Sequence, residues 1–533
     1  MAESDPLVIK IHQESSNVSQ TKRAAQSVLM LIAFAVFSKV FGFIRQALIA
    51  ARFGSGIETD IYFIAQSANA LFTMIITSSL ATTTIPVLTR VSALEGKKGK
   101  IDHASNMLSI TFLIAVAISV LAWIIAPLIM KVFAYGFEEE QFEFAVFMMR
   151  IGSPIILFAA LTGIFNGYLQ SENRFFASSM GDTTQNVSYI IFLLFFASRF
   201  GIIGLMITTV LGVVAQLAVL VVESRAIGFR YRPILHFKDK YVQQVFSLIP
   251  PILLSVAIND VNSMVDKAMA STLVNGSISA LDYASRLNIL IVSIFVTSIV
   301  TVLYPLLAQG VAENNIQEVK KTTLQGINMI IIITIPATLG MLVLAKPIVQ
   351  IAYERGAFDA VATQMTAGAL SFYTLSLVSL SIYSLITRVF YSLHDTKTPM
   401  INSAIAVVVN LTMNIILIRP LAHRGLALAT SISSIVTTGI LLLLLRKKIG
   451  VLGLNRTLLC GIKSTISAII MTGVVLLVYS KTERLLGTSF SGKFSGLLIP
   501  IGVGAVLYFL LLYAFKVEEL SWAVEILKKR MKR

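Results

Sequence analysis

Three basic residues interrupt one long apolar run, SKVFGFIRQALIAARFG at 38–54: Lys39, Arg45 and Arg52. If a membrane-spanning helix begins near residue 25, Lys39 lies roughly 20 Å along it, near mid-bilayer, and Arg45 about 9 Å further. A cation at mid-helix costs about 2.5–3.5 kcal/mol on insertion scales, so a compensating role is expected. Arginine forks bind phosphate oxygens bidentately, and these residues therefore indicate a phosphate-bearing ligand.

Charged residues recur in later apolar runs. The set expected to face one central cavity consists of Lys39, Arg45, Arg286 and Arg388. Asp60 and Asp182 are secondary charges that face the cavity or neutralise an arginine, and Arg52 either joins them or snorkels to the outer headgroups. Gly42 lowers the cost of bending the first helix and is a candidate hinge. Because the set stays cationic after pairing, the cavity is predicted to bind anions.

A second group of residues offers hard oxygen ligands. Asn410 and Asn414 are spaced i,i+4 and share a helix face, while Asp266 and Thr430 lie in other apolar runs. Such ligands hold sodium in transporters. Interhelical hydrogen bonding by Asn and Thr within the membrane is the alternative. Sodium is the sole cofactor that we expect.

The composition is that of an integral membrane protein. Of 533 residues, 56% are hydrophobic and only 13% are charged, whereas soluble domains carry near a quarter. Fourteen apolar stretches are long enough to span roughly 30 Å of hydrocarbon as helices. Their approximate ranges are 26–51, 59–88, 104–134, 143–170, 177–199, 201–226, 243–271, 277–308, 322–344, 361–393, 399–419, 422–446, 459–480 and 493–515. The predicted fold is therefore all-α.

Lysine and arginine gather in alternate loops. GKKGK at 96–100, RYRPILHFKDK at 230–240, EVKK at 318–321 and RKK at 446–448 are basic, whereas FEEEQ at 137–141 is acidic. By the positive-inside rule both termini are expected in the cytoplasm. The net charge of +16 mostly reflects this bias toward anionic lipid and does not require nucleic acid.

The two halves of the chain resemble each other at an offset of about 220 residues. TIPVLTRVSALEGKKGK at 84–100 matches VLYPLLAQGVAENNIQE at 302–318, and APLIMKVFAYGFEEE at 126–140 matches KPIVQIAYERGAFDA at 346–360. Six helices in each half return the chain to the same side, which predicts two six-helix lobes around a cavity. The predicted segments are a cytoplasmic 1–25, an N-lobe 26–226, a basic linker 227–242, a C-lobe 243–446, a final helix pair 459–515 and a basic amphipathic tail 516–533.

The sequence offers little for catalysis. The single cysteine, Cys460, excludes an intrachain disulfide, and the loops of under about 20 residues are too short for a catalytic domain. We see no phosphate-binding glycine loop or nucleophile elbow, so a transporter is expected rather than an enzyme.

Three stretches closely resemble the MurJ (MviN) family, lipid II flippases of the multidrug/oligosaccharidyl-lipid/polysaccharide exporter superfamily. They are SKVFGFIRQALIAARFGSGIETDIYFIA at 38–65, YERGAFD at 353–359 and RVFYSLHDTKTP at 388–399. The resemblance implies alternating-access transport of undecaprenyl-diphosphate-linked peptidoglycan precursor to the outer leaflet, for cell-wall synthesis. It implies functional roles for the cavity set above and for Ser38, a lipid-tail groove in the final helix pair, and sodium binding at positions matching the oxygen ligands.

The chain departs from many members at Gln46, Thr73 and Ile289, where those members carry charges. A flippase for another polyprenyl-diphosphate glycan therefore remains an alternative, as does a multidrug or cation antiporter, which would need an acidic cavity. The expected location is the bacterial cytoplasmic membrane. The expected partners are lipid II and membrane lipids, with no nucleic acid, and the chain is expected to be a monomer.

Overall fold

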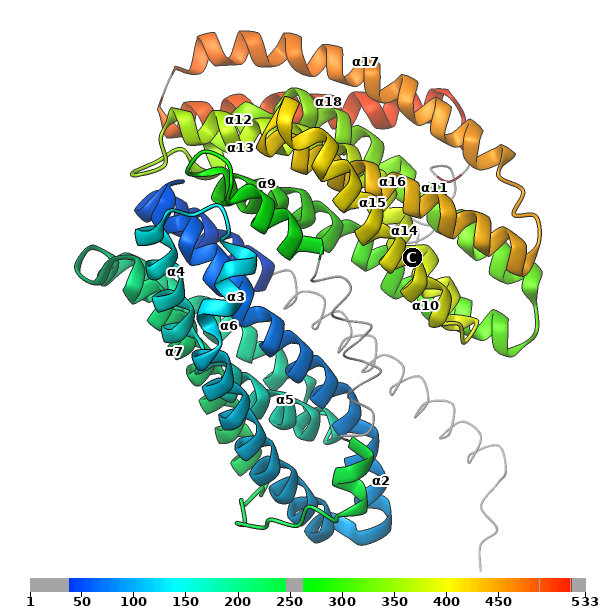
Figure 1. Cartoon of the computed structure of the whole chain (residues 1–533). Coiled ribbons are helices and arrows are strands. Elements are labelled where there is room, and N and C mark those ends of the chain that lie inside the picture. Colours follow the sequence, from blue (N-terminus) through cyan, green and yellow to red (C-terminus); the bar gives the residue numbers. More distant parts are fainter. Residues whose placement is uncertain (1–37, 246–261, 488, 518, 520–533) are drawn as a thin grey trace, which may run out of the picture.

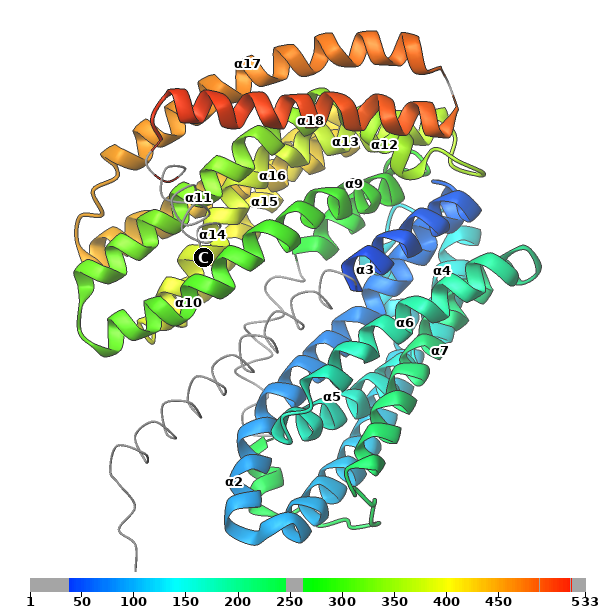
Figure 2. The same cartoon turned by 180° about the vertical axis from the view of Figure 1, so that it is seen from behind.

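The computed structural model describes residues 38–245, 262–487, 489–517 and 519, and this part of the chain is helical without strands. The predicted first helix is described only from residue 38, and the predicted 243–271 span only at its two ends. Two halves lie side by side and meet at one end, with the final helix pair over the outer face of the C-terminal half (Figures 1 and 2).

The N-terminal half starts with a helical segment at 38–53. The next element, α2 (Ile57–Ile124), is interrupted at Gly96, whose φ of 70° separates two arms. These arms run as an antiparallel pair (Figure 1). The remaining helices are α3 (Ala126–Phe133), α4 (Glu139–Gly152), α5 (Ile155–Ser171), α6 (Phe175–Phe195) and α7 (Ala197–Ala226).

The C-terminal half repeats this order of elements. After a helical segment at 262–270 come α9 (Ser277–Ile291), the π-helical turn η1 (Val292–Val296), α10 (Thr297–Ala312), α11 (Ile316–Val343), α12 (Ala345–Tyr353), α13 (Ala360–Tyr373), the 3-10 turn η2 (Thr374–Ser376), α14 (Leu377–Ser392), α15 (Lys397–Leu421) and α16 (His423–Ile449). The short helices α3 and α12 begin at 126 and 345, 219 residues apart. The break between α4 and α5 in the N-terminal half lies at the position that η2 takes between α13 and α14 in the C-terminal half. The final pair is α17 (Asn455–Leu486) and α18 (Phe490–Ala514).

Ten helices in the described ranges are long and apolar enough to cross a membrane, which confirms an all-α, multi-pass membrane protein. The number fourteen and the domain boundaries stay predictions. Several predicted spans are interrupted, among them 104–134 at Ile125, 143–170 at Ser153 and Pro154, 277–308 at η1 and 361–393 at η2. Proline explains the first two interruptions, because it stands near the start of α3 and immediately before α5 and cannot donate a helix hydrogen bond.

Apolar packing explains why the halves meet at one end only. One buried cluster takes residues from both halves, such as Ile49 and Ile61 with Tyr353 and Phe358. A second cluster lies within the N-terminal half and its following segment, and a third joins the C-terminal half to α17 and α18. The halves therefore share one core at the end where they touch, and each is held by its own core elsewhere.

The RVFYSLHDTKTP stretch comprises the end of α14, the turn that follows it and the start of α15. His394 takes a φ of 58° and Asp395 then accepts hydrogen bonds from the backbone and hydroxyl of Thr398, at 3.0 and 2.8 Å. Lys448, at the end of α16, donates to the same carboxylate at 2.5 Å. Asp395 thus links three helix ends. Burial alone would raise the pKa of Asp395, but the bonds from Lys448 and Thr398 outweigh it and lower that pKa to about 2.

This lowered pKa predicts a pH-dependent contribution to stability. Because the folded pKa lies below the usual value near 3.9, the contribution is fully present above about pH 4 and is lost as the pH falls toward 2. We expect Asp395→Asn to reduce the free energy of unfolding by no more than about 1 kcal/mol at neutral pH, since the pair is partly exposed. Thermal melts in detergent should show the two proteins converging at acid pH. A difference that persists unchanged at pH 2.5 would contradict this assignment.

Candidate functional site: a cationic cavity between the halves

A cavity of about 290 Å³ lies where the two halves meet, and three of its lining side chains are cations. Arg45 comes from the first helical segment, Lys267 from the segment at 262–270, and Arg286 from α9. The remaining lining is largely polar or small: Gln66, Ser67, Asn69, Ala70, Thr73, Gly152, Ile155, Gln185, Tyr189, Met206 and Thr209. Cations from both halves thus surround one polar space.

Asp282 holds two of these cations in place. Its carboxylate accepts from Arg286 Nε at 2.6 Å and from Lys267 Nζ at 3.4 Å. Gln46, which is buried beside Arg45, donates to the same carboxylate at 3.3 Å. Among the described residues, Asp282 is thus one buried acid beside three lining cations, which leaves a positive excess.

Arg45 is held differently. Its guanidinium lies over the Tyr189 ring, 4.8 Å from the centroid, and its buried Nε has no hydrogen-bond partner. A buried guanidinium donor without an acceptor is costly unless a ligand supplies one. The arrangement is suited to an anion with several oxygens, because a cation–π contact positions the planar group without using its donors.

The other predicted cavity residues do not line this space. Lys39 is exposed near the start of the described helix, where the Ser38 carbonyl accepts from Asn186 at 3.5 Å. Arg388 is exposed in α14, with the rings of Tyr304 and Tyr391 at 5.7 and 5.8 Å. Their roles stay predictions, and the structure does not bring them to the Arg45 cavity.

The secondary residues have local roles. Arg52 donates to the carbonyls of Leu193 and Leu194 at the end of α6, at 3.0 and 3.4 Å. Asp182 accepts from Gln216 at 3.0 Å. Gly42 lies beside Asn186 in an uninterrupted stretch of helix, so its use as a hinge stays a prediction.

The four oxygen-bearing residues do come together. Asn414 donates to Asp266 Oδ1 at 2.6 Å and to Asn410 Oδ1 at 2.9 Å, while Thr430 donates to Asp266 Oδ2 at 3.1 Å. Asn410 Nδ2 donates to Thr430 at 3.3 Å. The buried Asn414 Oδ1 has no partner. This oxygen cluster joins the segment at 262–270 to α15 and α16.

Comparison with known proteins identifies the family. The family model described as "Lipid II flippase MurJ" matches residues 49–495. The chain belongs to the lipid II flippase MurJ family. The match begins after Arg45, so Lys39 and Arg45 of the first helix lie outside it and Arg52 lies within it.

Individual MurJ relatives extend this result. The chain is 29% identical over 417 residues to "Probable lipid II flippase MurJ" of Rickettsia prowazekii, covering 77% of this chain and 82% of the relative. The Vibrio cholerae relative of the same description is 28% identical over 439 residues, covering 80% and 83%. A solved structure described as "Lipid II flippase MurJ, inward closed conformation" aligns with a TM-score of 0.75 at 26% identity, covering 91% of this chain and 98% of that one. A MATE multidrug transporter shares the fold at TM-score 0.67 and 14% identity.

Three cavity features escaped the sequence analysis. Lys267 follows Asp266 directly, but on a helix adjacent residues point in different directions, and Lys267 faces the cavity while Asp266 faces the oxygen cluster. Asp282 lies four residues before Arg286, a spacing that pairs charges on a helix and that could have been recognised. Gln46 is one of the three positions where the chain departs from many MurJ members, and it donates to Asp282. Of the other two, Thr73 lines the cavity and Ile289 is 53% exposed.

Asp60 fastens the two halves at the end where they meet, here called the closed end: residues 51–60 with 276–283 and 353–358. Its carboxylate accepts the backbone N–H groups of Gly276 and Ser279, both at 2.7 Å. An acid from α2 therefore caps the positive N-terminus of α9 in the other half. Tyr283 adds a hydroxyl bond to the Gly54 carbonyl at 3.1 Å.

Two glycines allow the backbones to touch there. Gly54 and Gly356 have φ values of 68° and 59°, and a Cβ on Gly356 would lie 2.2 Å from the Ala51 carbonyl oxygen. The next residue, Ala357, donates its N–H to that oxygen at 2.8 Å. The YERGAFD stretch is thus the turn that seals the closed end against the first helix.

We therefore expect Gly356→Ala to loosen the closed end. The backbone strain alone costs about 1–3 kcal/mol, and the clash with Ala51 adds to it. Thermal melts should show a lower melting temperature, and cysteines placed at the closed end should react faster with a water-soluble maleimide. Gly340→Ala is the matched control, since a Cβ there meets nothing within 4 Å. Equal melting and labelling of the two variants would refute the sealing role.

Proposed function

We propose that the chain moves lipid II across the bacterial cytoplasmic membrane, with the diphosphate bound by Arg45, Lys267 and Arg286. The observation that carries the proposal is the cavity itself, in which three described cations from both halves surround one space and outnumber Asp282, the buried acid that binds two of them. Two phosphates bring closely spaced negative charges, which match such a space better than a cationic drug does. Membership of the MurJ family supports the same substrate.

Transport would follow by alternating access. The anion bridges Arg45 of one half and the Lys267–Asp282–Arg286 group of the other. Binding it neutralises charges that otherwise repel across the interface, so it favours states in which the halves approach around the cavity. Release at the closed end requires breaking the Asp60 and Gly356 contacts, which are bonds to backbone groups, and separating the apolar cluster that the halves share there.

The charge distribution supports an orientation. The basic segments near Gly96, in the 230–240 stretch and in the first turns of α11 lie at the ends of the halves away from the closed end (Figures 1 and 2). By the positive-inside rule, that side faces the cytoplasm, as would both termini, and the closed end faces outward. We further propose that the chain acts as a monomer, catalyses no covalent reaction and binds no nucleic acid.

Two alternatives keep some support. A flippase for another polyprenyl-diphosphate glycan would use the same cations, and the uncharged Gln46 and Thr73, where many family members carry charges, fit a slightly different substrate. A multidrug or cation antiporter shares the fold, but the positive excess in the cavity argues against it.

The decisive test combines binding with growth. Native mass spectrometry of the purified chain should show lipid II binding that Arg45→Ala and Lys267→Gln each weaken at least about tenfold, because loss of a charge-assisted bond costs about 1.5–3 kcal/mol. Both variants should fail to complement a flippase-depleted strain at normal protein levels. Arg199→Gln, a surface change over Phe200, is the control and should support growth. Wild-type binding by both cavity variants would remove the diphosphate assignment.

We also propose that the oxygen cluster binds sodium. The residues fit, because the orphan Asn414 Oδ1, Asn410 Oδ1, Thr430 Oγ1 and the Asp266 carboxylate are hard oxygen donors within one buried site. A sodium ion there would compensate the buried carboxylate. Rotation of the Asn414 amide would aim its oxygen inward, and the cluster would then tie the 262–270 segment to α15 and α16.

Sodium should accordingly raise the melting temperature relative to potassium at equal ionic strength, because general screening acts alike for both salts. Asp266→Asn should abolish the difference in melting temperature between the two salts. Because Asp266 faces the oxygen cluster and does not line the cavity, lipid II binding should stay within about twofold of wild type, which is under about 0.5 kcal/mol. Asp102→Asn, at a partly exposed carboxylate paired with Arg232, is the control and should keep the sodium effect. Identical curves in both salts for wild type would leave the four residues as interhelical hydrogen-bonding partners.

A further inference from the structure

A second cationic pocket lies on the outer side of the C-terminal half, away from the central cavity. Its volume is about 660 Å³, and it is formed by the start of α11, the turn before α17 and residue Glu519. The cations that line it are Lys320, Lys321 and Arg456. It shares no lining residue with the Arg45 cavity.

Among the described residues that line this pocket, cations outnumber acids three to one. Glu519 is the acid among its lining residues, and that carboxylate already accepts a hydrogen bond from Asn328. Lys321 has a loose pair with Glu318 at 3.7 Å, in which both side chains are largely exposed. Such a pair is weak in water. The pocket therefore suits an anionic group with several oxygens.

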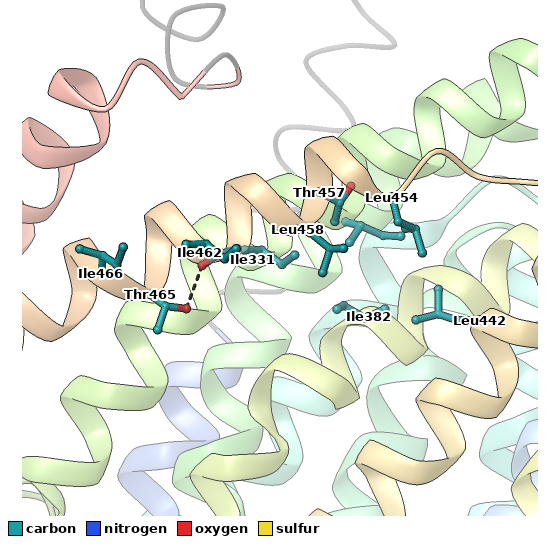
Figure 3. A pocket seen from close by; sticks show the side chains of 11 residues that line it. Ile331, Ile382, Leu442, Leu454, Thr457, Leu458, Ile462, Thr465 and Ile466 are labelled. Carbon is teal, nitrogen blue, oxygen red and sulfur yellow. Dashed lines mark hydrogen bonds between the residues drawn. The ribbon is translucent and has the colours of Figure 1, made fainter.

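An apolar groove continues from this pocket. It has a volume of about 460 Å³ and runs between α17 and the helices α11, α14 and α16 (Figure 3). Thr457 lines both spaces, and beyond it the groove is lined by Ile327, Ile331, Ile382, Leu442, Leu454, Leu458, Gly461, Ile462, Thr465 and Ile466. No residue of α18 lines it, so it differs from a groove within the final helix pair.

The groove faces the hydrocarbon. Leu458, Ile462 and Ile466 of α17 are 63%, 56% and 46% exposed, although α17 is apolar and long enough to span the membrane. The cationic pocket lies at the ends of α11 and α17, where spanning helices meet the headgroup layer. A polar, cationic recess thus stands at interface depth and opens directly into an apolar channel at hydrocarbon depth.

We propose that this composite site binds one anionic glycerophospholipid of the bilayer. The phosphate and its headgroup lie among Lys320, Lys321 and Arg456, and one acyl chain lies in the groove beside Gly461. A soluble anion would use the pocket but not the groove, and a zwitterionic lipid would gain little from three cations. The bound lipid fills space between α11 and α17 and so fastens the final helix pair to the C-terminal half. The site is separate from lipid II transport and does not depend on it.

The headgroup is tested by native mass spectrometry of the full chain with phosphatidylglycerol and phosphatidylcholine of identical acyl chains. Wild type should retain one phosphatidylglycerol preferentially. The triple variant Lys320→Gln/Lys321→Gln/Arg456→Gln should lose that preference, by roughly fivefold in affinity for each cation removed. The control Arg90→Gln/Lys98→Gln/Arg230→Gln removes three exposed cations elsewhere and should keep it. Equal retention by the two triple variants would overturn the proposal.

The acyl chain is tested separately by filling the groove. Gly461 lines the groove and a Cβ there meets nothing within 4 Å, so we expect Gly461→Leu to place its side chain in the groove. It should reduce phosphatidylglycerol retention, whereas Gly473→Leu, on the same helix and also in open space, should not. Soluble glycerophosphoglycerol should compete poorly. Unchanged retention by Gly461→Leu, or competition by the soluble headgroup at the lipid's own concentration, would contradict a composite lipid site.

Discussion

The structure around the cavity depends on one buried carboxylate. Asp282 binds Arg286 and Lys267 directly and is reached by Gln46 from the other half. A buried cation without a partner would cost several kcal/mol, and three together would repel one another. Asp282 reduces both costs without cancelling the positive charge. The cavity therefore keeps a positive excess that attracts an anion.

At the closed end, hydrogen bonds to backbone groups join the halves. Asp60 caps α9, and the N–H of Ala357 donates to the carbonyl of Ala51. Contacts of this kind are directional and bury little apolar side-chain volume, although one apolar cluster does cross between the halves. Separation at this end would expose part of that cluster, so a second compact state must cover it again. The free energy of exposing that apolar surface is therefore a cost that a transport cycle must offset.

The segment at 262–270 connects two chemistries. Asp266 points into the oxygen cluster with α15 and α16, and the adjacent Lys267 points into the cavity. A displacement of this segment by less than one helical turn would change both environments at once. A ligand in the oxygen cluster could affect binding in the cavity, and the reverse, through a shared segment that has two arrangements.

Much of the fold was predictable from the sequence, because a bilayer requires long apolar helices and because duplication leaves matching proline and loop patterns. The positions of the interruptions within the spans were not predictable. Hydropathy registers neither the single non-helical residue Ile125 nor the three-residue turn η2. Residue type alone identified Arg45 and Arg286, whose burial in apolar runs needed an explanation. It also identified the oxygen cluster, since the i,i+4 spacing of Asn410 and Asn414 determines their shared face.

Which charges share one space was decided only by the tertiary structure. Lys39 and Arg388 satisfy the same sequence criterion as Arg45, yet they are exposed elsewhere, because helix rotation and depth depend on packing against neighbours. Lys267 enters the cavity for the same reason, and Asp60 becomes a helix cap because α9 begins beside it. The sequence by itself determined a membrane-spanning, duplicated, cation-bearing helical protein, since these properties follow from composition and spacing. The pairing of its charges required the positions of helices hundreds of residues apart.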